Sequence, residues 1–139
     1  MFKRLILNDL IEWSQKANRK PLLLRGARQV GKTSAVKIFS RNYDQFIYLN
    51  LDKPEHRKLF DPEKPFQEIL NAIFFYMEFQ KDFGRSLVFI DEIQQSSTAV
   101  SLLRYFHEEA PELHVIAAGS LLETLFDSEI SFPVGRIEY

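Results

Sequence analysis

The sequence contains no cysteine, so it offers neither a disulfide framework nor a cysteine-ligated metal site. That composition fits the reducing cytoplasm. None of its apolar runs is long enough to span a membrane. The first ten residues contain Lys3, Arg4 and Asp9 and lack the uninterrupted apolar core of a signal peptide. We therefore expect a cytoplasmic protein without a membrane span.

An excess of charge of one sign is also missing. The chain has 18 basic and 19 acidic residues and a formal net charge of -1. It therefore lacks the global basic field that indicates nucleic-acid binding, although a local basic patch would still permit it. The histidines His56, His107 and His114 lie far apart without the spacing of metal ligands, and we interpret them as structural.

What is present is the composition of a soluble globular protein. Hydrophobic residues make up 45% and charged residues 27% of the 139 residues, enough for one domain with its own core over residues 1–139. Phenylalanine is frequent, with 13 residues. Two interpretations of this abundance stay open: a core rich in phenylalanine, or a surface that further chain or a partner covers.

Glycine is scarce, and two of the five glycines frame a motif. Residues 26–33, GARQVGKT, match the pattern G-x-x-x-x-G-K-[ST] of the phosphate-binding P-loop. An apolar run precedes this stretch and helically spaced apolar residues follow it, which is the strand–loop–helix context that the motif requires. Backbone N–H groups and the positive end of the helix dipole would hold phosphate there.

Each position of the motif has an expected role. The residues expected to bind the nucleotide are Gly26, Ala27, Arg28, Gln29, Val30, Gly31, Lys32, Thr33 and Ser34. Lys32 would reach the β- and γ-phosphates, and the Thr33 hydroxyl would bind Mg²⁺.

Helical and extended patterns alternate along the chain. Helices are predicted at 2–14, from the P-loop to about 40, at 66–80 and at 98–109, with a helical turn at 55–60 and a short helix from Ser120; strands are predicted at 21–25, 45–51, 86–90 and 113–118. Residues 128–139 have no clear period. The alternation predicts an α/β fold with a parallel sheet, in which ligands bind at the carboxyl ends of the strands.

Two acids follow the apolar strand at 86–90, which is the Walker B pattern. Asp91 would hold Mg²⁺, mostly through water, and Glu92 would orient or deprotonate the water that attacks the γ-phosphate. The alternative for the pair is a solvated turn or a helix cap.

Ser120 would contact the γ-phosphate or cap the next helix. Arg136 would act on a γ-phosphate in its own chain or in a neighbouring chain, or is an ordinary surface arginine.

These motifs together resemble the AAA-type ATPases of bacteria and archaea that are often paired with a C-terminal DUF4143 domain. The resemblance rests on residues 25–33 (RGARQVGKT), 49–52 (LNLD), 89–94 (FIDEIQ), 118–120 (AGS) and 132–136 (FPVGR). It implies a three-layer, AAA+-like P-loop NTPase core with strand order 5-1-4-3-2 and Mg-ATP as ligand. It also implies Ser120 as sensor 1 and Arg136 as a candidate arginine finger, which fits a homo-oligomer.

Members of that family usually continue through a winged-helix-like region and the DUF4143 portion. We therefore expect this chain to be a truncated core without the lid that covers the nucleotide. The predicted function is Mg-dependent ATP hydrolysis, and the alternative is a nucleotide-dependent switch or scaffold with negligible turnover. A P-loop kinase is disfavoured, because a carboxylate at Glu92 suits the activation of water.

Overall fold

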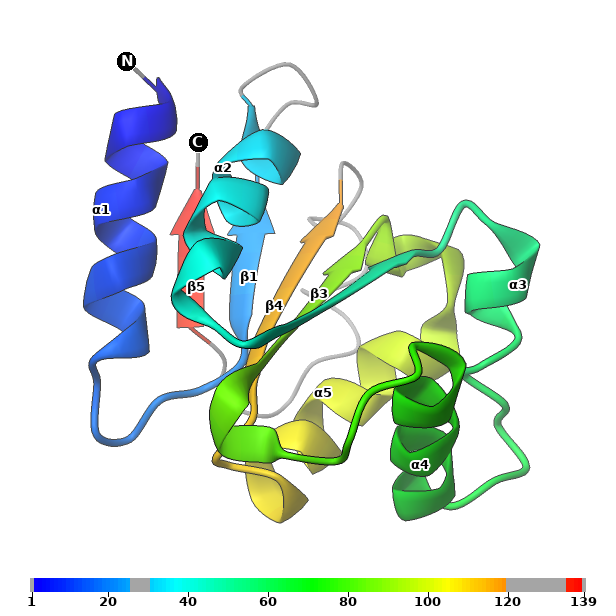
Figure 1. The fold of residues 1–139 in the computed structure, drawn as a ribbon. Coiled ribbons are helices and arrows are strands. Elements are labelled where there is room, and N and C mark those ends of the chain that lie inside the picture. The colour runs from blue at the N-terminus through cyan, green and yellow to red at the C-terminus, as the bar shows by residue number, and fades with distance from the viewer. Residues whose placement is uncertain (1, 26–30, 120–134, 139) are drawn as a thin grey trace.

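The computed structural model describes residues 2–25, 31–119 and 135–138, and within them the strands form one parallel sheet (Figure 1). The strands are β1 (Leu22–Arg25), β2 (Gln45–Asn50), β3 (Ser86–Asp91), β4 (His114–Gly119) and β5 (Gly135–Glu138). Their order across the sheet is β2-β3-β4-β1-β5, and every pair of neighbours is parallel. This is the predicted order 5-1-4-3-2, with β4 between the P-loop strand and the strand that ends in the two acids.

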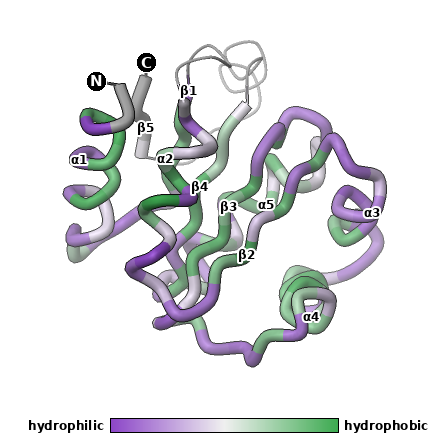
Figure 2. Tube along the Cα trace, turned by 45° about the horizontal axis from the view of Figure 1, so that its top comes forward, coloured by the Kyte–Doolittle hydropathy of each residue, from purple (hydrophilic) through white to green (hydrophobic). Residues whose placement is uncertain are grey.

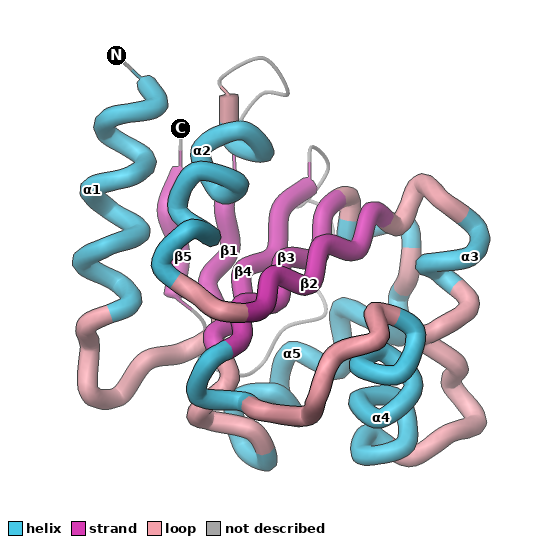
Figure 3. Tube along the Cα trace, in the orientation of Figure 1, coloured by secondary structure: helices cyan, strands magenta, loops and turns pink. Residues whose placement is uncertain are grey.

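Helices cover both faces of the sheet (Figures 1 and 3). They are α1 (Phe2–Ser14), α2 (Lys32–Phe39), α3 (Pro54–Arg57), α4 (Phe66–Tyr76) and α5 (Ser97–Glu109), and short 3-10 turns lie at Ser40–Asn42, Phe83–Arg85 and Ile93–Gln95. Among these helices, none is long and apolar enough to cross a bilayer. The position of the helices on both faces of the parallel sheet confirms the predicted three-layer α/β architecture.

The core consists of two clusters, one on each face of the sheet, because successive side chains of a strand point to opposite faces. Leu22 and Leu24 of β1 pack with α1 and α2, whereas Leu23 between them packs with the cluster that contains α4 and α5. Figure 2 shows the hydrophobic stretches running through β3 and β4, and hydrophilic ones around α3. Most described phenylalanines are buried or half-buried, but Phe75 on α4 is 85% exposed.

Helix α4 ends at Tyr76, four residues before the predicted end at Gln80. The N–H of Phe79 donates to the carbonyl of Phe74, and the N–H of Glu78 donates to that of Phe75, both at 3.0 Å. This pair of bonds is a Schellman motif, which usually places glycine at its left-handed position. Here that position is Glu78, with φ 59°. Because no glycine marks the stop, the sequence pattern overestimated the length of the helix.

Strand β5 was not located from the sequence, because its four residues have no apolar run. The structure places it beside β1, with Gly135 opposite Leu22. The Gly135 N–H donates to the Pro21 carbonyl at 3.0 Å. A Cβ atom at Gly135 would lie 3.3 Å from the Leu22 side chain and 3.7 Å from the indole of Trp13. A glycine here lets the edge strand approach α1 and β1 closely.

Candidate functional site

The candidate site lies at the edge of the sheet where β2 and β3 end and α2 begins. A cavity of about 240 Å³ opens there. It is lined by Lys32, Thr33, Asn50, Asp52, Asp91 and Glu92. Four of these residues, Lys32, Thr33, Asp91 and Glu92, were predicted to share one site from two motifs almost sixty positions apart. The structure brings these four together.

Helix α2 begins directly after Gly31, whose φ of 82° and ψ of 25° lie in the left-handed region that favours glycine. The Gly31 carbonyl accepts hydrogen bonds from the Ala35 N–H at 3.0 Å and from the Ser34 hydroxyl at 3.2 Å. The predicted nucleotide-binding residue Ser34 thus supports the turn at the start of the helix. The N–H groups of a first helical turn lack partners within the helix and form an anion-binding end.

Lys32 is the first residue of α2, yet the residue is only 5% exposed. A lysine is rarely buried to this degree without a partner for its charge. Since Lys32 also lines the cavity with three acidic residues, Asp52, Asp91 and Glu92, the local charges balance one another in part.

Asp91, at the end of β3, is held by three donors. Its Oδ2 accepts hydrogen bonds from the Thr33 hydroxyl and from the Tyr48 hydroxyl, each at 3.0 Å. Its Oδ1 accepts the backbone N–H of Glu92 at 3.0 Å. Only 9% of Asp91 is exposed. The carboxylate is therefore fixed in orientation beside the hydroxyl of the P-loop threonine.

Glu92 adopts a left-handed backbone conformation, with φ 54° and ψ 46°. That conformation costs a residue with a Cβ atom about 1–2 kcal/mol. Its Oε2 accepts a hydrogen bond from the side-chain amide of Gln94 at 3.1 Å. Strained backbone of this kind is concentrated at functional sites, where the surrounding structure maintains it.

The structure adds three residues that sequence reasoning missed: Tyr48, Asn50 and Asp52. Asn50 is the register partner of Asp91 on the neighbouring strand, and its side-chain oxygen accepts the Asp52 N–H at 3.1 Å. The Asn50 N–H donates to Nδ1 of His56 at 2.9 Å, so this histidine has a structural contact. The sequence contained a signal only for Asp52, which belongs to the polar stretch directly after the predicted strand at 45–51, whereas Tyr48 and Asn50 lie inside that strand.

The remaining predicted site residues fall into two groups. Gly26, Ala27, Arg28, Gln29 and Val30, together with Ser120, lie outside the described residues. The backbone of Arg136 lies in β5, where it pairs with Leu23, two residues before the carboxyl end of β1. The arrangement that the structure describes therefore consists of the last three residues of the P-loop motif and the strand ends of β2 and β3.

The donor set fits Mg²⁺ with a nucleotide. The hydroxyl of Thr33 and the carboxylate of Asp91 are hard oxygen donors, which Mg²⁺ prefers. Among the described residues, no cluster of three or more His, Cys, Asp or Glu side chains could hold a metal ion alone. Mg²⁺ is commonly bound by one or two protein oxygens, by water and by substrate phosphates, and this site has that character.

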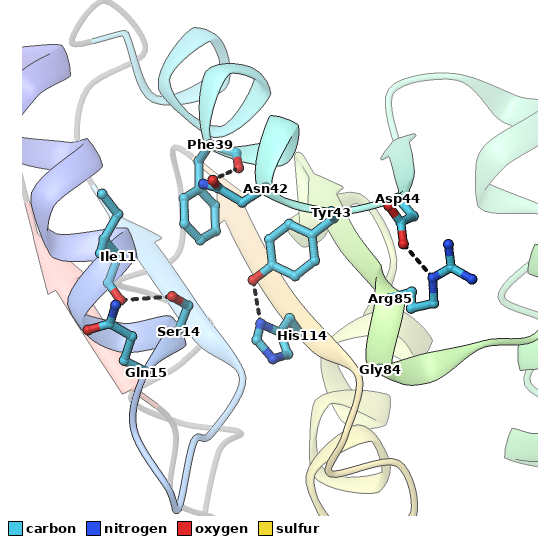
Figure 4. A pocket seen from close by; sticks show the side chains of 10 residues that line it. All are labelled: Ile11, Ser14, Gln15, Phe39, Asn42, Tyr43, Asp44, Gly84, Arg85 and His114. Carbon is cyan, nitrogen blue, oxygen red and sulfur yellow. Dashed lines mark hydrogen bonds and ion pairs between the residues drawn. The ribbon is translucent and has the colours of Figure 1, made fainter.

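A second cavity, of about 480 Å³, lies near the opposite edge, where β2, β3 and β4 begin (Figure 4). The Tyr43 hydroxyl and Nδ1 of His114 share a hydrogen bond there. Burial, and to a smaller degree the charge of Arg19, lower the pKa of His114 to about 4. Trp13 packs edge-on against the same ring, with centroids 5.7 Å apart. The cluster joins α1 to the sheet and contains none of the predicted site residues.

The sheet order, the left-handed glycine before α2 and the Lys-Thr pair facing an acidic strand end define a P-loop NTPase fold. The chain belongs to the AAA domain family, because the family profile matches residues 18–139. This membership supports a nucleotide-binding, ATPase-like function. The pairing with a C-terminal DUF4143 domain stays a prediction.

Similarity to individual proteins is weaker. A solved structure of PCH-2 from C. elegans aligns with 99% of this chain at 18% sequence identity and a TM-score of 0.49. The chain spans 39% of the length of that protein. No curated protein matches the sequence.

Proposed function

We propose that the protein binds Mg-ATP at the cavity between Lys32 and Asp91 and hydrolyses it. The observation that supports this most directly is the hydrogen bond of 3.0 Å between the Thr33 hydroxyl and Asp91 Oδ2. In a P-loop site these two groups must meet beside the phosphates, and no ordinary surface turn needs them together.

Each residue has a physical task in this proposal. Bound Mg²⁺ would neutralise charge that develops on the phosphate oxygens. The Lys32 ammonium stabilises the same charge from inside a buried setting, where it acts more strongly than in water. Thr33 supplies a ligand oxygen, and Asp91 accepts a hydrogen bond from a metal-bound water. Glu92 takes a proton from the attacking water, whose oxygen bonds to the γ-phosphorus as the bond to the β-phosphate oxygen breaks.

The contact between Gln94 and Glu92 favours a second candidate, a nucleotide-dependent switch with negligible turnover. An amide that already donates to Glu92 Oε2 holds the carboxylate where it lies and occupies one of its acceptor positions. In that case ATP would bind and change the surroundings of Glu92 without being hydrolysed.

The test compares the wild type with Glu92→Gln, by calorimetry for ATP binding and by phosphate release for turnover. If Glu92 is the general base of hydrolysis, Glu92→Gln should bind ATP normally and release phosphate at least about 100-fold more slowly than the wild type. Glu109→Gln is the matched control, because Glu109 is exposed at the end of α5. Equal turnover in both variants would reject the role of Glu92, binding without turnover in the wild type would favour the switch, and no ATP binding would reject both.

The roles of residues 26–30, Ser120 and Arg136 are part of the same proposal. For Arg136, a homo-oligomer that shares sites would allow complementation. Mixing Arg136→Ala with Lys32→Ala protein would then restore some turnover, since each could supply what the other lacks. Without restored turnover, Arg136 acts in its own chain or not at all. Binding of nucleic acid by the protein rests on analogy of fold alone.

A further inference from the structure

Tyr48 lies in the middle of β2 and reaches the metal-binding carboxylate diagonally across the sheet. Its register partner on β3 is Phe89, whereas Asp91 pairs with Asn50 two positions later. Positions two apart on neighbouring strands share a face of the sheet, and a long side chain can span the distance between them. The Tyr48 side chain spans this diagonal, and its hydroxyl donates a hydrogen bond to Asp91 Oδ2 at 3.0 Å.

The ring of Tyr48 is held by contacts around it. It stacks on Phe89, with centroids 5.5 Å apart and an interplanar angle of 28°, and Phe46 stacks at 6.2 Å. The Lys37 ammonium of α2 lies 4.9 Å from the centroid of the ring, a cation–π distance. The hydroxyl is therefore presented to Asp91 by a side chain whose orientation is set by the sheet and by α2 together.

The Tyr48 hydroxyl acts as a hydrogen-bond donor. A carboxylate has no proton to donate when it is ionised, so the phenol O–H donates and Asp91 Oδ2 accepts.

Three donors occupy most of the acceptor capacity of Asp91. A carboxylate offers about four lone-pair positions, and Thr33, Tyr48 and the Glu92 N–H take three of them. About one position is left for a further donor. A water bound to Mg²⁺ is such a donor, and it would meet a carboxylate that cannot rotate away.

We propose that Tyr48 is a positioning residue for the metal, which fixes Asp91 so that its remaining acceptor position receives a water of the Mg-nucleotide. This inference rests on the proposed function. Removal of the hydroxyl would free Oδ2 from one of its two donors and allow the carboxylate to turn. Loss of a group that orients a metal-binding residue typically weakens metal binding about 10- to 100-fold.

The experiment compares the wild type, Tyr48→Phe and Tyr43→Phe. Tyr43→Phe removes the same hydroxyl from a half-buried tyrosine at the opposite edge of the sheet. Binding of a fluorescent ATP analogue is titrated over a range of free Mg²⁺ concentrations and repeated in excess EDTA, and bound Mn²⁺ is counted by electron paramagnetic resonance. We expect the half-saturating metal concentration to rise about tenfold in Tyr48→Phe alone, while affinity in EDTA stays unchanged.

Several outcomes would overturn the inference. An unchanged or lower metal requirement in Tyr48→Phe would mean that Tyr48 does not position Asp91 or competes with the metal. An equal loss in EDTA and in Mg²⁺ would indicate a general defect of the fold. If the wild type bound nucleotide without any dependence on metal, the proposed Mg-ATP site would fail first, and that result is seen in the wild type, not in the variant.

Discussion

The hydroxyl of Thr33 and the carboxylate of Asp91 are 58 residues apart in the sequence and 3.0 Å apart in the structure. Thr33 stands at the start of α2, and Asp91 ends β3, which is separated from β1 by β4. The contact therefore depends on the strand order, because the crossover from β1 through α2 to β2 passes over β4 and β3. It ties the proposed metal-binding chemistry of the site to the topology of the sheet.

The first prediction concerns that hydroxyl. Thr33→Val keeps the shape of the side chain but removes the oxygen that would bind Mg²⁺ and donate to Asp91. We expect the half-saturating Mg²⁺ concentration for nucleotide binding to rise about 100-fold. Thr33→Ser retains a hydroxyl and should stay within about threefold of the wild type, by the same reasoning. Both are measured by calorimetry at fixed nucleotide, and similar behaviour of the two variants would contradict a ligand role for Thr33.

The second prediction concerns Lys32, which is only 5% exposed. In Lys32→Met the apolar stem remains and the charge is lost, so the fold should tolerate the change. Because hydrogen bonds to charged groups contribute about 1.5–3 kcal/mol, nucleotide affinity should fall roughly 10- to 150-fold. Lys16→Met, in the exposed loop after α1, is the matched control. Full nucleotide affinity in Lys32→Met would place the phosphates elsewhere.

Much of the fold was predictable because its signals are local. Buried parallel strands read as apolar runs, and α1 and α5 show helical periodicity up to their ends; Ser96 caps α5 by accepting the Ala99 N–H at 3.0 Å. The strand order is not local, and it was predicted from family resemblance instead. The end of α4 was missed because Glu78, and not a glycine, takes the left-handed position of the turn. Strand β5 was missed because its place depends on the long-range contacts of Gly135 with Leu22 and Trp13, which no local residue pattern predicts.

The candidate site likewise contains residues that the sequence predicted and one, Tyr48, that it could not predict. Two motifs of fixed internal spacing contain Lys32, Thr33, Asp91 and Glu92. Each motif follows a strand, and ligands bind at the carboxyl ends of parallel strands, so the sequence predicts that these residues share one edge of the sheet. The involvement of Tyr48 depends on the register between β2 and β3. A shift of one residue in that register would turn its side chain to the opposite face, and nothing in the sequence of β2 alone sets the register.

The third prediction uses the two described non-glycine residues with positive φ, Glu78 and Glu92. Glu78→Gly should raise the free energy of unfolding by about 1 kcal/mol, because glycine adopts the left-handed position of the Schellman motif without strain. Glu92→Gly should also stabilise the protein, by about 0–1 kcal/mol, since the lost Gln94 contact offsets part of the gain. Only Glu92→Gly should abolish phosphate release.

Urea unfolding provides the stability in this comparison, and phosphate release provides the activity. Stabilisation by both substitutions, with activity lost in one, would mean that strain at Glu92 is maintained for function. A free energy of unfolding of Glu78→Gly that is more than about 0.5 kcal/mol below that of the wild type would contradict the assigned helix end.

The fourth prediction concerns acid stability and the cluster around His114. Its pKa is lowered from 6.5 to about 4, mainly by burial and then by the charge of Arg19, so the unfolded chain binds a proton at a higher pH than the folded protein does. The free energy of unfolding should therefore fall as the pH drops from about 6.5 to 4. After discounting for partial exposure of the ring, we expect His114 to account for roughly 1–2 kcal/mol of that loss.

The measurement is urea unfolding of the wild type and His114→Gln across that pH range. Burial and then the charge of Lys53 lower the pKa of His56 as well, which gives a slope of the same sign, but that slope is common to both proteins and cancels in their difference. The variant loses the ring that packs on Tyr43, with centroids 5.1 Å apart, so it should be less stable at pH 7. Because it also loses the titrating group, the gap between the two proteins should narrow toward pH 4. A gap that stays constant with pH would mean that His114 takes up its proton equally in the folded and unfolded states.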